Sequence, residues 1–493
     1  MHKNVSLFNL ILIITTTVYS FSSMTTAYFM MGSKSLIWFL VSALGYFIPY
    51  ALIVAQYTRK YANRSGSIYD WLKDSLSPRI AFITAFLWYC SYFIWMISLF
   101  MKITIPTSIL LFGKDHTGDI HWLSLPAQFW LALCSILIIL LLTYLVTKGF
   151  HTILSFLKIS SYAMIGLLIL SFISNLIIIG QNPTSFGTNL QNSFQAASFF
   201  STNGNHLFSQ LPFFIFSITA FGGLDTVASL ADRTTQSRGR FPKAVIFSAI
   251  LIFTLYVCSI LLWSGANHLT TLRKGNVLHL GNLMYGLINN MSLQIASIFQ
   301  LSPQHSNLLN QLYVRYTALT MLLAYISLLS SISYGPLKSL IQGTPKELWP
   351  ARFTKLNKQK MPEKALWIQA LLLSLSVLVI ALNNSFVSSL FNQLTYMTNV
   401  SRAIPYFIVA ASFFFFLRKN IVQKEDLFVQ SLQINRLLSY SVCVCIFIAI
   451  FFQIYEPLRL GEYMNFWTLI IGPLAFGLVA AGIYRHFEKR IQL

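Results

Sequence analysis

The sequence predicts an all-α integral membrane protein with about twelve transmembrane helices, arranged as two inverted five-helix repeats followed by two C-terminal helices. Three observations predict this class. Of the 493 residues, 56% are hydrophobic and only 10% are charged, a composition typical of proteins that face lipid. Apolar runs of about 20 residues recur along the chain, and each is long enough to cross a bilayer. Two of these runs, five spans apart, contain features that interrupt a helix.

The predicted spans follow the apolar runs in chain order. They are Leu7–Met31, Leu36–Tyr57, Ile80–Thr107, Pro126–Val146, Ile153–Ile179, Leu211–Ala231, Ala244–Trp263, Tyr313–Ile341, Ala365–Ala381, Val387–Leu417, Leu438–Ile454 and Trp467–Tyr484. The first repeat is expected at 1–180, the second at 207–417, the last two spans at 435–485 and a short cytoplasmic tail at 486–493. The outer segment after the seventh span contains a polar-apolar stretch, Leu278–Phe299, in which we expect a short interfacial helix that caps the outer face.

The distribution of basic residues predicts the orientation of the chain. Placing the N-terminus inside leaves roughly 25 Lys and Arg on the cytoplasmic side and about five outside. The segment Lys346–Lys364 carries many of them, whereas Gln181–Gln210 carries none. We therefore predict a multi-pass protein of the bacterial inner membrane with both termini in the cytoplasm. The net charge of +21 is scattered over short loops, so the lipid bilayer and not a nucleic acid is the expected partner.

No motif of an enzyme or a cofactor site is present. The five cysteines all fall within apolar runs, which argues against a disulfide framework and against a closed zinc site. H-E-x-x-H, G-x-S-x-G and P-loop patterns are absent from the sequence. We predict no metal, no cofactor and no enzymatic activity.

The stretch Phe221–Asp225 reads FGGLD and lies inside the sixth apolar run. Asp225 is the one acidic residue deep within a span, about 20 Å along the helix from Leu211. A carboxylate at this depth costs several kcal/mol by insertion scales and usually lines a substrate or proton route. The alternative is that Asp225 pairs with a neighbouring helix only to hold the bundle together. The adjacent Gly222 and Gly223 favour a break in the helix, which frees backbone groups to bind a ligand.

The first span contains a comparable interruption. Residues Thr15–Thr26 read TTTVYSFSSMTT, and hydroxyl groups crowd this stretch. Such hydroxyls can simply bond back to their own helix, which is the alternative interpretation. Broken helices at the first and sixth spans would meet near the membrane midplane, where helix N-termini attract a carboxylate and free carbonyls with Asp225 attract an ammonium group. The predicted ligand is therefore a zwitterion.

Basic residues within the predicted spans include Lys102, Lys158, Arg315 and Arg402. Lys102 and Arg315 are close enough to the outer interface that we expect their side chains to snorkel toward water. Lys158 could snorkel at the inner end of the fifth span or replace a bound cation. Arg402 is mid-span, so it should face the bundle interior, where it either pairs with a carboxylate such as Asp225 or meets an anionic substrate.

These residues resemble a known family, the amino acid permeases of the amino acid–polyamine–organocation superfamily, and most closely its glutamate/γ-aminobutyrate antiporter branch. VYSF at Val18–Phe21 looks like the branch's broken-helix motif, with Tyr19 at the place of a substrate-pocket tyrosine. FIPYALIVAQ, ending at Gln56, and the following SGSIYDWLKDSLSPR resemble the second span and the loop after it. FGGLD resembles the sixth-span break, and GTPKELWPARFTKLNKQKMP resembles a cytoplasmic segment between spans eight and nine.

The resemblance implies the fold of the neurotransmitter:sodium symporters and the exchange or proton-coupled uptake of amino acids. Three positions depart from the branch. The eighth span lacks a glutamate that the resemblance places near Leu328, and in the tenth span Arg402 falls where a pocket tyrosine would be, while Tyr406 aligns with another pocket tyrosine. A pocket that loses an acid and gains a base favours anionic ligands such as glutamate or aspartate.

The sequence therefore predicts a secondary active transporter of amino acids that works by alternating access. The alternative is a non-concentrative amino acid channel or a transporter-like sensor. Asp225 is expected to link protons to substrate and gating, with protons as the candidate coupling ion. The residues expected to bind the substrate are Tyr19, Ser20, Ser22, Ser23, Thr219, Ala220, Phe221, Gly222, Gly223, Arg402 and Tyr406. The sequence leaves open which amino acid is carried, whether coupling is antiport or proton symport, and the oligomeric state.

Overall fold

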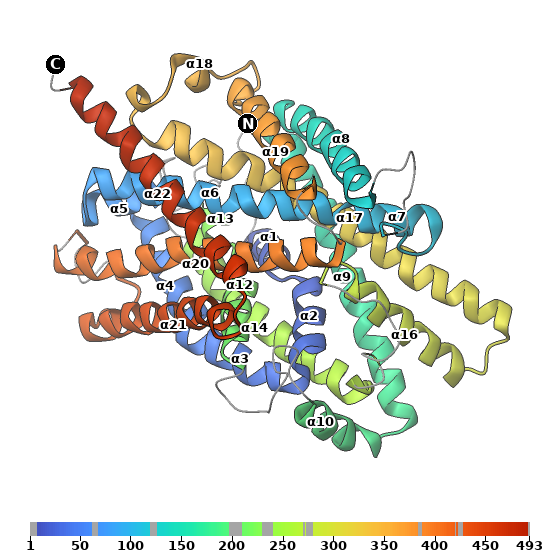
Figure 1. Cartoon of the computed structure of the whole chain (residues 1–493). Helices are drawn as coiled ribbons and strands as arrows, with labels where there is room; N and C mark the ends of the chain where they lie inside the picture. Colours follow the sequence, from blue (N-terminus) through green and yellow to red (C-terminus); the bar gives the residue numbers. More distant parts are fainter. Residues whose placement is uncertain are drawn as a thin grey trace.

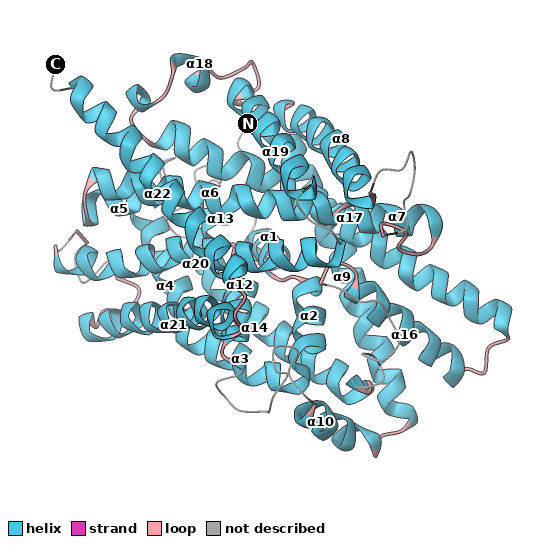
Figure 2. Cartoon of the chain, viewed as in Figure 1, coloured by secondary structure: helices cyan, strands magenta, loops and turns pink. Residues whose placement is uncertain are grey.

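The computed structural model describes residues 7–61, 68–118, 126–196, 210–228, 240–269, 272, 280–382, 387–419, 421–422 and 427–491. This described part of the chain consists of helices and the loops that join them, and it contains no strand (Figure 2). The helices pack side by side in one bundle (Figure 1). The predicted all-α class is thereby confirmed.

Within the described residues, 10 helical runs are long and apolar enough to cross a membrane. The prediction of about twelve spans differs from this number for two reasons. The first run, Leu10–Lys60, has 51 residues and would be about 77 Å long if straight, more than twice the thickness of a hydrocarbon core. It therefore contains both the first and the second predicted spans. The sixth predicted span is split into helices that are too short to qualify singly.

The first half of the chain supplies spans one to five. Its elements are α1 (Leu7–Val18), α2 (Phe21–Met31), the 3-10 helix η1 (Gly32–Lys34), α3 (Ser35–Ser42), the π-helical turn η2 (Ala43–Phe47), α4 (Ile48–Lys60), α5 (Ile68–Ser75), α6 (Pro78–Lys102), α7 (Thr104–Phe112), α8 (Ala127–Thr147), α9 (Phe150–Gln181) and α10 (Ser185–Gln195). Gly32 ends α2 with a φ of +58°, a conformation that favours glycine, and there the chain turns from the first span into the second.

The second half supplies the remaining spans. Its elements are α12 (Pro212–Ala220), α13 (Leu224–Ala228), α14 (Arg240–Ala266), α16 (Leu283–Ile298), α17 (Pro303–Gly343), the 3-10 helix η4 (Lys346–Leu348), α18 (Ala351–Thr354), α19 (Glu363–Leu382), α20 (Val387–Arg418), α21 (Leu432–Arg459) and α22 (Tyr463–Ile491). The helix predicted within 278–299 is present as α16, which packs against α17 and α9. The end of the sixth predicted span, 229–231, lies outside the described residues.

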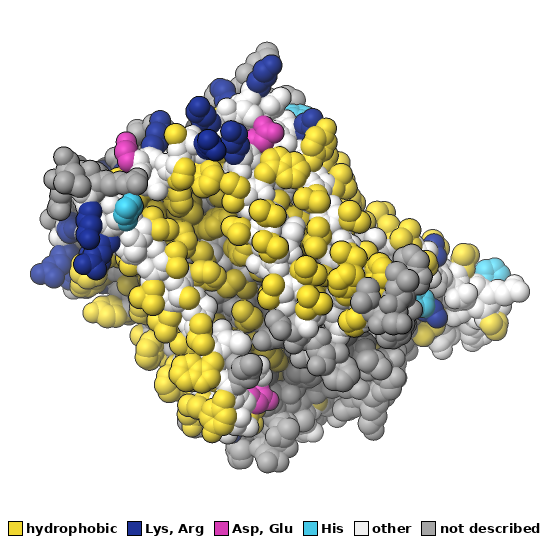
Figure 3. Space-filling model, turned by 45° about the horizontal axis from the view of Figure 1, so that its top comes forward, with side chains coloured by type: hydrophobic (Ala, Val, Ile, Leu, Met, Phe, Trp, Pro, Cys, Tyr) yellow, Lys and Arg dark blue, Asp and Glu magenta, His cyan; other side chains and the backbone are white. Residues whose placement is uncertain are grey.

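The outer surface of the bundle is strongly apolar. Large side chains such as Leu437 and Phe447 on α21 and Leu474 and Leu478 on α22 are more than 60% exposed. Figure 3 shows hydrophobic side chains covering most of one face, with Lys and Arg gathered along its edges. A surface this apolar is stable in lipid and not in water, so the chain is a multi-pass membrane protein.

Two of the basic residues within the spans lie as expected for snorkelling side chains. Lys158 on α9 and Arg315 on α17 are both exposed. The side chain of Arg315 donates a hydrogen bond from Nε to Gln311 Oε1 at 3.3 Å on its own helix. Their exposure favours the snorkelling interpretation of Lys158 over a place at a bound cation. Lys102 and Arg402 lie elsewhere and are described with the site.

Candidate functional site

The first span breaks where the hydroxyl-rich stretch predicts. α1 ends at Val18 and α2 begins at Phe21, with Ser20 as the N-cap of α2. The Ser20 Oγ accepts a hydrogen bond from the Ser23 backbone N–H at 3.1 Å. This cap satisfies one of the first N–H groups of α2 and leaves others at the break without partners within the helix. A positive helix end thus lies in the middle of the first span.

The hydroxyl groups around this break divide into two sets. Thr16 and Thr17 bond back to carbonyls of Leu12 and Ile13 on α1, at 2.8 and 2.7 Å, as the alternative interpretation expects. Thr25 does the same on α2. A second set faces inward and lines a cavity: Ser20, Ser22, Ser23 and Thr26. Thr17 belongs to both groups, because it also lines the cavity, whereas the second set lines the cavity at the break itself.

The sixth span breaks at the glycine pair. α12 ends at Ala220, and α13 begins at Leu224. Gly223 has a φ of +123°, a backbone conformation that residues other than glycine rarely adopt. Gly222 has a different role, because a Cβ there would lie 2.6 Å from Nη2 of Arg402 and 2.9 Å from the hydroxyl of Tyr406. The first glycine lets a guanidinium approach the break, and the second allows the backbone to turn.

Tyr256 on α14 joins the two breaks. Its hydroxyl accepts a hydrogen bond from the Ser20 backbone N–H at 3.1 Å and donates one to the Ala220 carbonyl at 3.0 Å. Its ring centroid lies 4.7 Å from that of Tyr19 and 5.2 Å from that of Phe221. One phenol therefore fixes the two interruptions relative to each other, although they are about 200 residues apart in the sequence.

This link makes a prediction about stability. Tyr256→Phe keeps the ring but leaves the Ser20 N–H and the Ala220 carbonyl without their partner, at a cost of about 1–3 kcal/mol for each buried group. We expect a lower unfolding temperature in detergent than for the unmodified protein. The matched control is Tyr440→Phe on α21, because Tyr440 is 61% exposed. An unfolding temperature of Tyr256→Phe equal to that of the control would show that the phenol does not hold the breaks together.

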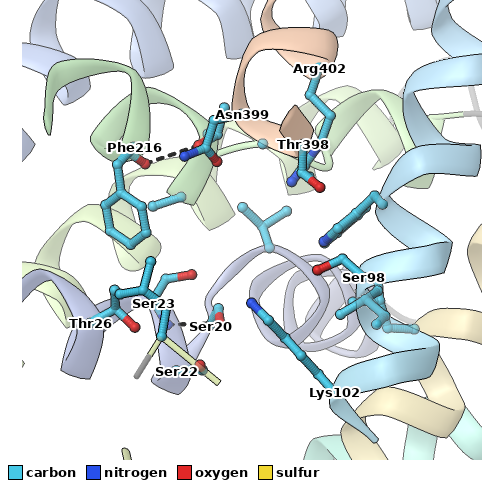
Figure 4. A pocket seen from close by; sticks show the side chains of 18 of the residues that line it. Ser20, Ser22, Ser23, Thr26, Ser98, Lys102, Phe216, Thr398, Asn399 and Arg402 are labelled. Carbon is cyan, nitrogen blue, oxygen red and sulfur yellow. Dashed lines mark hydrogen bonds between the residues drawn. The ribbon is translucent and has the colours of Figure 1, made fainter. Parts of the chain in front are cut away.

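A polar cavity of about 140 Å³ lies between the two breaks (Figure 4). Its volume is that of a few water-sized groups or of one small zwitterion. The lining comes from α1, α2, α6, α12, α17 and α20 and from the two breaks. Its polar members are Thr17, Ser20, Ser22, Ser23, Thr26, Ser98, Lys102, Thr219, Tyr325, Thr398, Asn399 and Arg402.

Arg402 reaches this cavity from α20. Its guanidinium carbon lies 3.8 Å from the centroid of a Trp95 ring, and its Nη2 donates to the Tyr406 hydroxyl at 3.4 Å. Among the described residues, no ion pair joins Arg402 to Asp225, and the buried Nε of Arg402 has no hydrogen-bond partner. Of the two alternatives for Arg402, direct pairing with Asp225 is therefore not what the structure shows. A cation without a paired carboxylate faces the cavity.

Lys102 also lines the cavity, so the expectation that it snorkels to the outer interface is wrong. Figure 4 shows its side chain pointing into the cavity from the side opposite Arg402, with Ser98 between them. The spacing along α6 carried this signal, because Trp95, Ser98, Leu99 and Lys102 follow the i, i+3, i+4, i+7 pattern of one helix face. A lysine on the same face as a serine and a tryptophan was a candidate for the interior.

Asp225 is completely buried beside the cavity and does not line it. Its Oδ2 accepts hydrogen bonds from the Trp88 indole N–H and from the Tyr92 hydroxyl, the latter at 2.9 Å. The Tyr92 hydroxyl in turn accepts one from Thr226. The other oxygen, Oδ1, is buried without a hydrogen-bond partner in the described part of the chain. Hydrogen bonds through Oδ2 therefore link the Asp225 carboxylate to α6, while Oδ1 makes no hydrogen bond to a described residue.

Unsatisfied polar groups gather around this carboxylate. The hydroxyls of Tyr46 and Tyr50 are buried and, like Asp225 Oδ1, have no partner among the described residues. Both rings pack against Tyr406, with centroids 6.2 and 5.4 Å away, and both hydroxyls are within electrostatic range of Asp225. Buried polar groups in native proteins are usually paired, so such a cluster requires an explanation in terms of function.

The structure brings together some of the predicted substrate-binding residues. Those that line the cavity are Ser20, Ser22, Ser23, Thr219, Ala220, Gly222 and Arg402. Those that do not line it are Tyr19, Phe221, Gly223 and Tyr406. Asp225, the residue predicted for proton coupling, does not line it either. The side chain of Tyr19 turns away and its hydroxyl bonds to Ser259 on α14 at 3.0 Å. Leu328, near which the resemblance places a glutamate, does line the cavity.

Sequence reasoning missed several lining residues. Asn399 is the clearest, because its Oδ1 accepts a hydrogen bond from the Thr219 hydroxyl at 2.9 Å and so joins α20 to the end of α12. Thr398, Tyr325 and Ser98 are further polar residues of the lining, and Trp95 also lines the cavity. Asn399 directly precedes Val400–Arg402 in the sequence, so its place one turn from the predicted arginine was a usable signal.

Comparisons with known proteins agree with this architecture. A family model described as amino acid permease matches residues 5–476. The chain is 32% identical over 493 residues to the inner membrane transporter YjeM of Salmonella typhimurium, a match that covers 99% of this chain and 97% of that protein. The protein of the same name from Escherichia coli is 32% identical over 492 residues, with the same coverage. The aspartate/glutamate permease AcaP of Lactococcus lactis is 24% identical over 391 residues, covering 79% of this chain and 74% of AcaP.

Proposed function

The chain belongs to the amino acid permease family, and we propose that it is a secondary active transporter that carries amino acids across the bacterial inner membrane by alternating access. Membership of the family makes it a membrane transporter of a small molecule and not an enzyme. The observation that carries the proposal is the polar cavity between the two broken helices. The names of the relatives support the inner membrane and include aspartate and glutamate among the candidate substrates.

The two breaks offer complementary groups to an amino acid. The N-terminus of α2 presents partial positive charge to the α-carboxylate, together with the side-chain hydroxyls of Ser22 and Ser23. The end of α12, with Thr219 and Ala220, presents carbonyl oxygens to the α-ammonium group. Gly222 keeps the backbone open between them. This arrangement would bind the α-carboxylate and the α-ammonium group, which all α-amino acids share.

Asp225 is the proposed site of proton coupling. The side chain of Tyr92 connects Asp225 to the cavity. Its hydroxyl donates a hydrogen bond to Asp225 Oδ2, and its ring centroid lies 5.8 Å from the guanidinium carbon of Arg402. Asp225 Oδ1 and the hydroxyls of Tyr46 and Tyr50 can each take a further hydrogen bond. A proton arriving at Asp225 would change the charge next to Arg402 and so alter how strongly the cavity holds its ligand.

The proposed orientation places both termini in the cytoplasm. The basic residues of the segment between the eighth and ninth spans are all exposed: Lys346, Arg352, Lys355, Lys358, Lys360 and Lys364. In Figure 1, α18 from this segment and α5 lie toward the C-terminal end of α22, whereas α10 and α16 lie at the opposite end of the bundle. The excess of positive charge at the first end supports a cytoplasmic location for it.

Uptake of labelled amino acids into proteoliposomes tests the proposal. Each amino acid is offered with and without an inward proton gradient, and again after the vesicles are preloaded with candidate exchange partners. Accumulation above equilibrium in either condition supports a secondary active transporter, and the condition that drives it separates proton symport from exchange. Entry that stops at equilibrium in every condition would favour the alternative, a channel. Binding without entry would favour a sensor.

A further inference from the structure

The charge of the cavity is unusual for a site that binds zwitterions. Two cations, Lys102 and Arg402, are among its described lining residues, and none of those lining residues is acidic. Leu328 contributes an apolar side chain to the same lining. The side chain of a neutral amino acid offers no charge to these two cations, whereas a side-chain carboxylate does, and charge–charge contacts are strong in a low-dielectric interior.

The two cations are placed for a ligand with more than one carboxylate. They point into one small cavity from opposite sides, with the hydroxyl of Ser98 between them (Figure 4). Arg402 is only 5% exposed, its buried Nε is unpartnered among the described residues, and stacking on Trp95 holds the plane of its guanidinium. Guanidinium groups fixed in this manner bind carboxylates through paired hydrogen bonds.

We propose that the cavity is selective for acidic amino acids and that Lys102 sets this selectivity together with Arg402. Lys102 and Arg402 each bring a basic side chain to the wall of the cavity. The ligand that complements both is an α-amino acid with a side-chain carboxylate in addition to its α-carboxylate. The inference rests on the proposed transport of amino acids through this cavity, and it assigns to Lys102 a role that its position near the end of a span did not indicate.

The test compares isosteric substrates. Initial uptake rates into proteoliposomes are measured for L-aspartate against L-asparagine and for L-glutamate against L-glutamine, which differ in charge and little in shape. We expect kcat/KM at least about tenfold higher for the acids, the effect of roughly one charge-assisted contact. Lys102→Met removes one of the two basic side chains from the cavity, so the acid-to-amide ratio should fall toward one while uptake of the amides persists.

Two further variants control this experiment. Lys102→Arg keeps the positive charge and should keep the preference for acids. Lys158→Met removes an exposed lysine of α9 that does not line the cavity, so it should leave the acid-to-amide ratio unchanged. If the kcat/KM of the unmodified protein for the amides equals that for the acids, the inference is overturned, while the proposed transport of amino acids stands. An unchanged ratio in Lys102→Met would overturn the role of Lys102. Absence of uptake for every amino acid would instead contradict the proposed function. If Lys102→Met does not fold, Lys102→Gln, which removes the charge and keeps a polar side chain, provides the same comparison of the acid-to-amide ratio.

Discussion

Arg402→Met is expected to reduce kcat/KM for aspartate and glutamate by on the order of 100-fold, about 3 kcal/mol of lost charge-assisted hydrogen bonding. The guanidinium lines the cavity and lies next to Gly222, where the sixth span breaks. Methionine fills a similar volume against Trp95 but offers no donor. Uptake kinetics in proteoliposomes measure the effect, and uptake of neutral amino acids should suffer much less, so that selectivity moves away from acidic substrates.

The fold should tolerate this substitution. Arg402 has no ion-pair partner among the described residues that its removal would leave behind, and its hydrogen bond to Tyr406 is long at 3.4 Å. Arg402→Lys keeps the positive charge but loses the planar guanidinium. Its kcat/KM for acidic amino acids should therefore lie between that of the unmodified protein and that of Arg402→Met. Arg315→Met is the matched control, because Arg315 is exposed on α17. Unchanged selectivity in Arg402→Met would remove this residue from the site.

Asp225→Asn is expected to abolish proton-driven accumulation and the pH dependence of transport while the protein still folds. An asparagine oxygen can accept the hydrogen bonds of Trp88 and Tyr92, so the attachment to α6 is retained. What is lost is the charge and the ability to exchange a proton. Substrate should then only equilibrate across the vesicle membrane, as uptake measured over a range of external pH would show.

A control separates this effect from a general loss of charge. Asp115 lies in the loop after α7, outside the membrane-spanning helices. Its Oδ1 accepts a hydrogen bond from the backbone N–H of Thr117. Asp115→Asn should leave gradient-driven uptake intact. If Asp225→Asn still accumulates substrate with an unchanged pH profile, Asp225 serves the packing of α13 on α6 and not the coupling.

The positions of both helix breaks could be predicted because their causes are local. Two adjacent glycines weaken a helix wherever they occur, and a serine that caps a new helix does so through its own neighbours. The structure confirms the break after Val18 and the break after Ala220. The division into inverted repeats that the spacing of the breaks indicates remains a prediction.

The residues that line the cavity are harder to predict, because they depend on how each helix is rotated about its axis relative to its neighbours. Tyr19 was assigned to the pocket by its place in the motif, yet its side chain faces α14. Lys102 was assigned to the interface by its depth alone, yet it faces inward. Tyr256 joins two segments from a third helix, and no local pattern marks such a contact.

A structure of the protein with a transported acidic amino acid bound tests the central claim most directly. The account predicts density for the ligand between the N-terminus of α2 and the end of α12, with carboxylate oxygens within hydrogen-bonding distance of Arg402 and Lys102. Ligand density at a place that contacts neither helix break would contradict it.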